Sequence, residues 1–206
     1  FEKLIHRDHA QSMQDGIAFP EVEIRDIWRR LLDESQLQLD EEMIERLAIR
    51  FECLVNPVWP MPGCEQLLLT LRDCGLKLGI ISNAQFYTPP MFESLLGRSL
   101  QKFGMVEEFC FWSYREREAK PSKALFTRLA AALAVSGVKT SEAIYVGNDM
   151  RNDIVPAQAV GFRTALFAGD QRSLRWREED EITVKPDLVL TELQQLLHCL
   201  MGDPSE

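Results

Sequence analysis

The sequence predicts an α/β protein, with a parallel sheet flanked by helices and a small all-helical domain before it. Three observations predict this. Residues 1–55 show only the helical spacing of apolar side chains. Three prolines within residues 56–63 then interrupt that spacing. Beyond them, short apolar runs alternate with helical patterns, as in sheets whose parallel strands are joined by helices. We therefore place the helical domain at residues 1–57 and the sheet domain at residues 58–206.

Two amphipathic helices are expected in the first domain. One presents an apolar face made of Ile24, Ile27, Trp28, Leu31 and Leu32. The next repeats this spacing with Ile44, Leu47, Ala48, Phe51, Leu54 and Val55. Asp40 stands where the second helix should begin and is suited to cap it.

In the second domain, apolar runs predict strands at residues 76–81, 108–112 and 144–146, after Gly161, and at 187–190. Helical faces between or after them are formed by Leu67, Leu68 and Leu71, by Met91, Leu95 and Leu96, by Leu125, Leu129, Ala132 and Leu133, and by Leu193, Leu196, Leu197 and Leu200. Residues 114–119 are expected to form a polar loop, Pro121 to lie in the first turn of the third helix, and Thr191 to cap the last. The charged run 175–181 is interpreted as a solvated loop.

Composition excludes several classes of function. A net charge of −9 and a pI near 5.0 disfavour binding to nucleic acid or to an anionic membrane, both of which require clustered Lys and Arg. No apolar run approaches the roughly 20 residues of a membrane span, and the first residues do not resemble a signal peptide, so we expect a cytoplasmic protein. The five cysteines form no Cys-x-x-Cys pair and are expected to be reduced thiols.

An acidic loop follows the apolar run at residues 144–146. It holds Asn148, Asp149 and Asp153, which should lie in the crevice at the carboxyl ends of the strands. Two carboxylates four positions apart suit a hard cation such as Mg²⁺. They are equally suited to cap the helix that follows, and the loop alone favours neither interpretation.

Three polar segments follow predicted strands and should converge at one edge of the sheet: Ser82-Asn83, Lys120 and the loop 148–153. A hydroxyl, backbone N–H groups at a strand-to-helix turn, a fixed cation and a bound divalent ion would together neutralise a phosphate. Individually, Ser82 is more typical of a turn residue and Lys120 of a solvated lysine.

These segments resemble the motifs of the haloacid dehalogenase-like hydrolase superfamily, whose members are mostly phosphatases. Leu-Gly-Ile-Ile-Ser-Asn at 78–83 is similar to the second family motif, Lys-Pro at 120–121 to the third, and Val-Gly-Asn-Asp-Met-Arg-Asn-Asp-Ile at 146–154 to the fourth. The resemblance implies a Rossmann-like core. It also implies that the helical domain is a small cap, which closes over the site and selects the substrate.

The resemblance assigns roles to individual residues. It implies that Ser82 and the backbone of Asn83 hold the transferring phosphoryl group, and that Lys120 pairs with this group and with the nucleophile. It implies that the acids of the fourth motif bind Mg²⁺. Where the family usually has Gly-Asp, this chain has Gly147-Asn148. Either Asn148 supplies a carbonyl oxygen or Asp149 is the ligand. We favour Asp149 and expect Asp153 to bind the metal through water or to orient Lys120.

The first family motif, which carries the aspartate nucleophile, does not precede the helical domain in this chain. We therefore expect that an N-terminal segment with a central strand has been removed, and that the chain as it stands is inactive. The expected whole protein is a Mg²⁺-dependent phosphatase that acts on a small phosphorylated metabolite through an aspartyl-phosphate. The alternatives are a metal-independent haloacid dehalogenase and a noncatalytic protein that binds a phosphorylated ligand or a partner protein.

Overall fold

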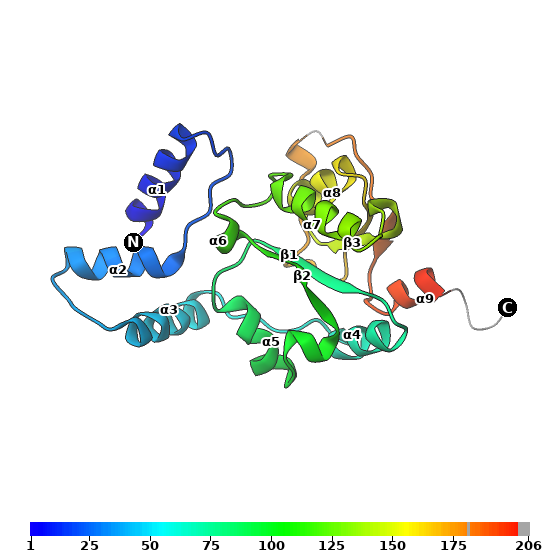
Figure 1. The fold of residues 1–206 in the computed structure, drawn as a ribbon, viewed down its shortest axis with the longest axis horizontal. Coiled ribbons are helices and arrows are strands. Elements are labelled where there is room, and N and C mark those ends of the chain that lie inside the picture. Colours follow the sequence, from blue (N-terminus) through cyan, green and yellow to red (C-terminus); the bar gives the residue numbers. More distant parts are fainter. Residues whose placement is uncertain (181, 202–206) are drawn as a thin grey trace.

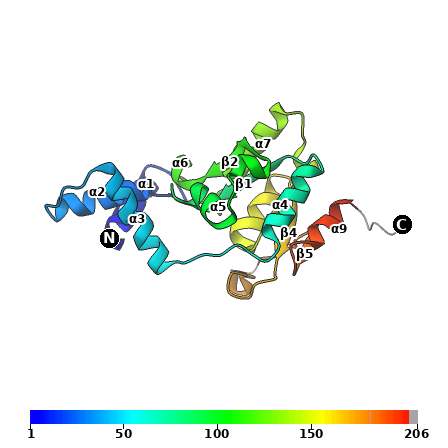
Figure 2. The same ribbon diagram turned by 90° about the horizontal axis from the view of Figure 1, so that it is seen from below.

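The computed structural model describes residues 1–180 and 182–201. Its helices and strands are α1 (Glu2–Gln14), α2 (Ile24–Glu34), α3 (Glu41–Val55), α4 (Cys64–Asp73), β1 (Leu78–Ser82), α5 (Thr88–Leu96), η1 (Leu100–Phe103), β2 (Met105–Trp112), α6 (Ser113–Glu116), α7 (Ala124–Val135), η2 (Thr140–Glu142), β3 (Ile144–Gly147), η3 (Met150–Ile154), α8 (Val155–Ala159), β4 (Arg163–Phe167), η4 (Glu178–Asp180), β5 (Leu188–Leu190) and α9 (Gln195–Met201). Figures 1 and 2 show α1–α3 at one end of the long axis and α9 at the other.

All strand pairs are parallel, which confirms the predicted fold class. β1 pairs with β2, and β3, β4 and β5 form a second sheet in that order. The last residue of β1, Ser82, lies opposite Trp112, the last residue of β2, and the last residue of β3, Gly147, lies opposite Leu166, the last but one of β4. Within each sheet, the carboxyl ends of the strands therefore share one edge, where loops can form a site.

Helices cover both faces of the second sheet. Because side chains alternate along a strand, successive residues of β4 pack against helices on opposite faces. Ala165 and Phe167 of β4 pack with apolar residues of α4 and α9. Leu166, between them, packs against Ile154 of η3 on the other face. A further apolar cluster joins α7, through Leu125 and other residues, to β1 and β2. The core of the sheet domain is thus layered, helix on sheet on helix.

The helices α1–α3 have an apolar cluster of their own, formed by Leu4, Val22, Ile24, Ile27, Trp28, Leu32, Ile44 and Ala48. Asp40 caps α3 as predicted, since its carboxylate accepts a hydrogen bond of 2.8 Å from the Met43 N–H. The segment between α1 and α2 runs back to the sheet domain. There the Ala119 N–H donates to Phe19 O at 2.7 Å and the Glu21 N–H donates to Arg117 O at 3.1 Å.

Three local predictions are wrong. Pro121 does not lie in the first turn of α7, which begins at Ala124, because residues 119–122 form a turn closed by the Ser122 N–H and Ala119 O. The expected loop 114–119 contains the short helix α6. Thr191 does not cap the last helix. Instead the side chain of Gln195 reaches back and accepts from the Thr191 N–H at 2.7 Å. No helix in the described ranges is long and apolar enough to cross a membrane.

Candidate active site

Lys120 and Asp153 form a buried ion pair beside the strand ends. The Lys120 ammonium lies 2.6 Å from Asp153 Oδ1, and the two side chains are only 11% and 5% exposed. The Tyr145 hydroxyl lies 3.1 Å from the same carboxylate oxygen and 3.1 Å from the Ile81 carbonyl. Burial alone would lower the pKa of Lys120, but its partners Tyr145 and Asp153 raise it above its ordinary value. The lysine is therefore held in its charged form.

The second oxygen of Asp153 fixes the acidic loop. Asp153 Oδ2 accepts hydrogen bonds of 3.0 Å from the backbone N–H groups of Asn148 and Asp149. Gly147 is required for this approach, because a Cβ at that position would lie about 2.5 Å from the Asp153 carboxyl group. Asp153 thus ties Lys120 to the end of β3.

Asn83 ties Lys120 to the end of β1. Its side-chain oxygen accepts a 2.7 Å hydrogen bond from the Lys120 N–H, and its amide nitrogen donates to the Lys120 carbonyl at 3.0 Å. The Ser82 hydroxyl is only half-buried, and its one hydrogen bond within the described residues is a long one, 3.4 Å, to Asn83 O. Ser82 therefore keeps a hydroxyl that can bind a ligand.

The carboxylate of Asp149 binds different partners from those of Asp153. Its carboxylate caps η3, accepting from the N–H groups of Arg151 and Asn152, and pairs with Arg177 at 2.7 Å. Burial alone would raise the pKa of Asp149, but the hydrogen bonds from Arg177 and from the backbone lower it below its ordinary value. The interpretation of 175–181 as a solvated loop is therefore wrong for Arg177.

Local sequence patterns do not point to two residues of this site. Tyr145 belongs to the predicted strand 144–146, and only its hydroxyl, which requires a polar partner inside an apolar run, could have drawn attention to it. Arg177 belongs to a charged run that is typical of a solvated loop. Its partner Asp149 lies 28 positions away in the chain, so only the fold relates them.

The oxygen atoms of the acidic loop fit a hard cation in kind but do not form a complete site. Asp149 and Asp153 are both engaged by protein donors. Asn148 donates through its N–H to Asp153 and through its amide nitrogen to Ser173 O at 2.5 Å, which leaves Asn148 Oδ1 without a donor among the described residues. In the described part of the chain, no group of three or more His, Cys, Asp or Glu side chains could hold a metal ion.

An apolar cavity of about 590 Å³ separates the two sheets beneath this site. Its walls include Gly79, Ile80 and Ile81 of β1 and Ile144, Tyr145 and Val146 of β3. Within residues 1–180 and 182–201, neither β1 nor β3 pairs with a second strand on the side facing the other sheet. Two strand edges with unpaired backbone groups therefore border an apolar space.

The sequence matches the family of haloacid dehalogenase-like hydrolases over residues 4–167. It is 33% identical over 144 residues to a glyceraldehyde 3-phosphate phosphatase of Pyrococcus furiosus, covering 68% of this chain and 54% of that protein. It is 27% identical over 140 residues to phosphoglycolate phosphatase 1 of Pseudomonas aeruginosa, covering 67% and 46%. The chain thus spans about half the length of these curated relatives.

Solved structures have a similar fold. A phosphatase of the same family from Thermococcus onnurineus superposes with a TM-score of 0.57 at 23% identity, covering 85% of this chain and 71% of that one. A 2-haloacid dehalogenase from Pseudomonas syringae gives a TM-score of 0.58 at 24% identity, covering 86% and 71%. Because the family match extends over most of the sequence, this chain belongs to the haloacid dehalogenase-like hydrolases.

Proposed function

We propose that the chain is part of a phosphatase that acts on small phosphorylated metabolites through an aspartyl-phosphate. The observation that carries the proposal is the buried Lys120–Asp153 pair, which Asn83 joins to the half-buried hydroxyl of Ser82. A charged lysine beside a half-buried hydroxyl suits a phosphoryl group, whose oxygens carry the charge to be neutralised. Curated relatives that are phosphatases support the same reaction class.

In this proposal the residues of the site have separate tasks. The Ser82 hydroxyl and the backbone at Asn83 bind the phosphoryl oxygens. Lys120 offsets their charge as it shifts during transfer, while Asp153 and Asn83 are positioning residues that hold the lysine. Since both oxygens of Asp153 already accept hydrogen bonds, it is poorly suited to attack phosphorus.

The nucleophile is then an aspartate outside these 206 residues. Its carboxylate oxygen attacks phosphorus while the bond between phosphorus and the ester oxygen of the substrate breaks. The leaving alkoxide takes a proton. Water then hydrolyses the acyl phosphate to restore the carboxylate and release phosphate. The apolar cavity between β1 and β3 supports this arrangement, because an apolar strand placed there would pair with both open edges and end near Lys120.

We further propose that Mg²⁺ is the cofactor, with Asn148 Oδ1 as the ligand from this chain and Asp153 as a contact through water. Asp149 is less suitable, because its carboxylate is used to cap η3 and to bind Arg177. When bound, Mg²⁺ would neutralise charge on the phosphoryl oxygens. Residues 1–57 are proposed to act as the cap over this site.

The test measures phosphate release from p-nitrophenyl phosphate and small sugar phosphates, and chloride release from 2-chloropropionate. It uses the 206-residue chain and a version extended upstream by the aspartate-bearing strand. We expect the extended protein to release phosphate, to lose this activity with EDTA and to recover it with Mg²⁺, whereas the 206-residue chain is inactive. Chloride release would instead support a dehalogenase. If the extended protein binds phosphorylated compounds without releasing either product, it is a noncatalytic binding protein.

A further inference from the structure

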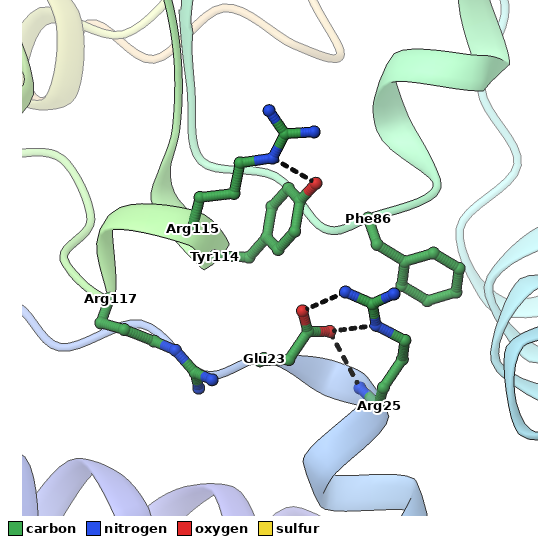
Figure 3. Close-up of a pocket in the computed structure, with 6 residues that line it drawn as sticks. All are labelled: Glu23, Arg25, Phe86, Tyr114, Arg115 and Arg117. Carbon is green, nitrogen blue, oxygen red and sulfur yellow. Dashed lines mark hydrogen bonds and ion pairs between the residues drawn. The ribbon is translucent and has the colours of Figure 1, made fainter. Parts of the chain in front are cut away.

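A second cavity lies between the helical domain and the sheet domain, and arginines line it. It measures about 470 Å³ and is lined by Glu23, Arg25, Phe86, Tyr114, Arg115 and Arg117 (Figure 3). Glu23 and Arg25 come from the start of α2, Phe86 from the loop after β1, Tyr114 and Arg115 from α6, which follows β2, and Arg117 from the position after α6. Three guanidinium groups line this cavity, although the net charge of the chain is −9.

The cavity adjoins the candidate active site. Phe86 lies three residues after Asn83, and Arg117 three residues before Lys120. Asn83 and Lys120 are joined by two hydrogen bonds. The two loops that hold the proposed phosphate site therefore also form the wall of this cavity. A ligand with its phosphoryl group at Lys120 could extend a second group into it.

The charges of two of the arginines are already compensated. Arg25 pairs with Glu23 at 2.6 Å and with Glu45 at 2.8 Å, and its guanidinium lies over the Phe86 ring at 4.7 Å. Arg117 pairs with Asp26 at 2.9 Å. These pairs fix the shape of the wall but add little net charge.

Arg115 is different, because it has no carboxylate partner among the described residues. Its Nε donates to the Tyr114 hydroxyl at 2.9 Å, which holds the side chain in place. Figure 3 shows its guanidinium beside that hydroxyl and away from Glu23. The two terminal nitrogens form a fork that can bind a carboxylate through two parallel hydrogen bonds.

We propose that this cavity binds a carboxylate of the substrate, so that the preferred substrates are phosphate monoesters of small carboxylic acids. This inference rests on the proposed function only for the binding of the phosphoryl group of the substrate. One uncompensated guanidinium matches the single charge of a carboxylate, whereas the dianion of a second phosphate would leave excess negative charge beside Glu23. Arg115 binds the carboxylate, and the Arg25–Glu23 pair sets its distance from Lys120.

The test compares 3-phosphoglycerate with glycerol 3-phosphate, which differ at one end by a carboxylate against an alcohol. Both are measured as substrates of the extended protein and as ligands by calorimetry. A charge-assisted pair should favour 3-phosphoglycerate by about 10- to 100-fold in kcat/KM and in affinity. In Arg115→Gln this selectivity should largely disappear. In Arg98→Gln, an exposed arginine that does not line the cavity, it should persist.

A second variant is expected to raise the affinity for 3-phosphoglycerate, a result that a folding defect would not produce. Glu23→Gln preserves an oxygen that can accept the Arg25 N–H at the start of α2, but it removes one of the two carboxylate charges that compensate Arg25. Affinity for 3-phosphoglycerate should rise in this variant, while it falls in Arg115→Gln. Loss of affinity in both variants would mean that the cavity is structural and would overturn the inference.

The failure of each proposal can be recognised separately. Hydrolysis of both compounds with equal efficiency would overturn the carboxylate site and leave the phosphatase intact. Selective binding of 3-phosphoglycerate without hydrolysis would reject the phosphatase and support the carboxylate site. A preference for 1,3-propanediol bisphosphate over 3-phosphoglycerate would show that the second group is a phosphate and would overturn the inference.

Discussion

Among single residues, Lys120 has a role in folding that its place in the sequence does not suggest. As an exposed lysine it could be replaced without harm to folding. In the structure it is buried against Asp153, whose carboxylate has almost no contact with solvent. Removal of one partner from such a pair leaves an uncompensated buried charge, which costs more than the pair itself contributes. The residue that is proposed to bind phosphate is therefore also important for stability.

Lys120→Met should lower the free energy of unfolding by about 3–5 kcal/mol. Lys123→Met, at an exposed position nearby, should change the free energy of unfolding little.

Because the pKa of Lys120 is raised on folding, the contribution of Lys120 to stability is fully present at neutral pH and declines only above about pH 10.4, the ordinary lysine pKa. Urea denaturation at pH 7 measures the loss. The double variant Lys120→Met with Asp153→Asn should recover much of it. If the single variant is as stable as the unaltered chain, the pair is not buried in solution.

Among the elements, a partly buried carboxylate takes part in the contact between the two domains. Glu21, in the segment before α2, accepts a hydrogen bond of 2.8 Å from Ser113 Oγ and another of 3.4 Å from Gln85 Nε2. Burial raises the pKa of Glu21 above its ordinary value, although the bond from Ser113 opposes this. The folded state thus retains a proton at pH values where the unfolded chain has lost it.

Stability should therefore fall as the pH rises from about 4.3, the ordinary glutamate pKa, through the raised pKa of Glu21. In Glu21→Gln this part of the pH dependence should be absent, because the amide carries no charge and can still hydrogen-bond Ser113. Thermal unfolding between pH 4 and pH 8 measures the difference. Glu2→Gln, at an exposed position on α1, serves as the control. Parallel pH profiles for the Glu21 variant and the unaltered chain would contradict the assignment.

The elements also show how far the sequence allowed prediction. The helices at 24–34 and 41–55 follow from local spacing and a local cap, and both are present. The start of α7 follows a backbone turn at residues 119–122, and at the start of α9 the side chain of Gln195 reaches back to the Thr191 N–H. Neither follows from the spacing of apolar residues, and there the predictions failed. The pairing of Asp149 with Arg177 requires a long-range contact that no local pattern contains.

At the scale of the whole molecule, the two sheets are separated by the apolar cavity. Helices α4, α7 and α9 contribute to its lining, so the space is bounded on several sides by side chains that would normally pack against a strand. Each square ångström of apolar surface left in contact with water forgoes about 25 cal/mol of stabilisation. The open edges of β1 and β3 add backbone groups that lack a strand partner.

The dye ANS, which fluoresces on apolar surface, should report this cavity. We expect the 206-residue chain to enhance ANS fluorescence, and Val146→Asn, in the cavity wall, to reduce it. Leu54→Ser is the control for dye bound elsewhere, because Leu54 is 75% exposed on α3 and does not line the cavity. In the extended protein a strand would fill the space, pair with both edges and bury the lining. Its dye fluorescence should therefore fall and its urea midpoint rise. If the extension leaves the fluorescence unchanged while that of the Leu54 variant drops, the dye binds the helical domain and the cavity is closed in solution.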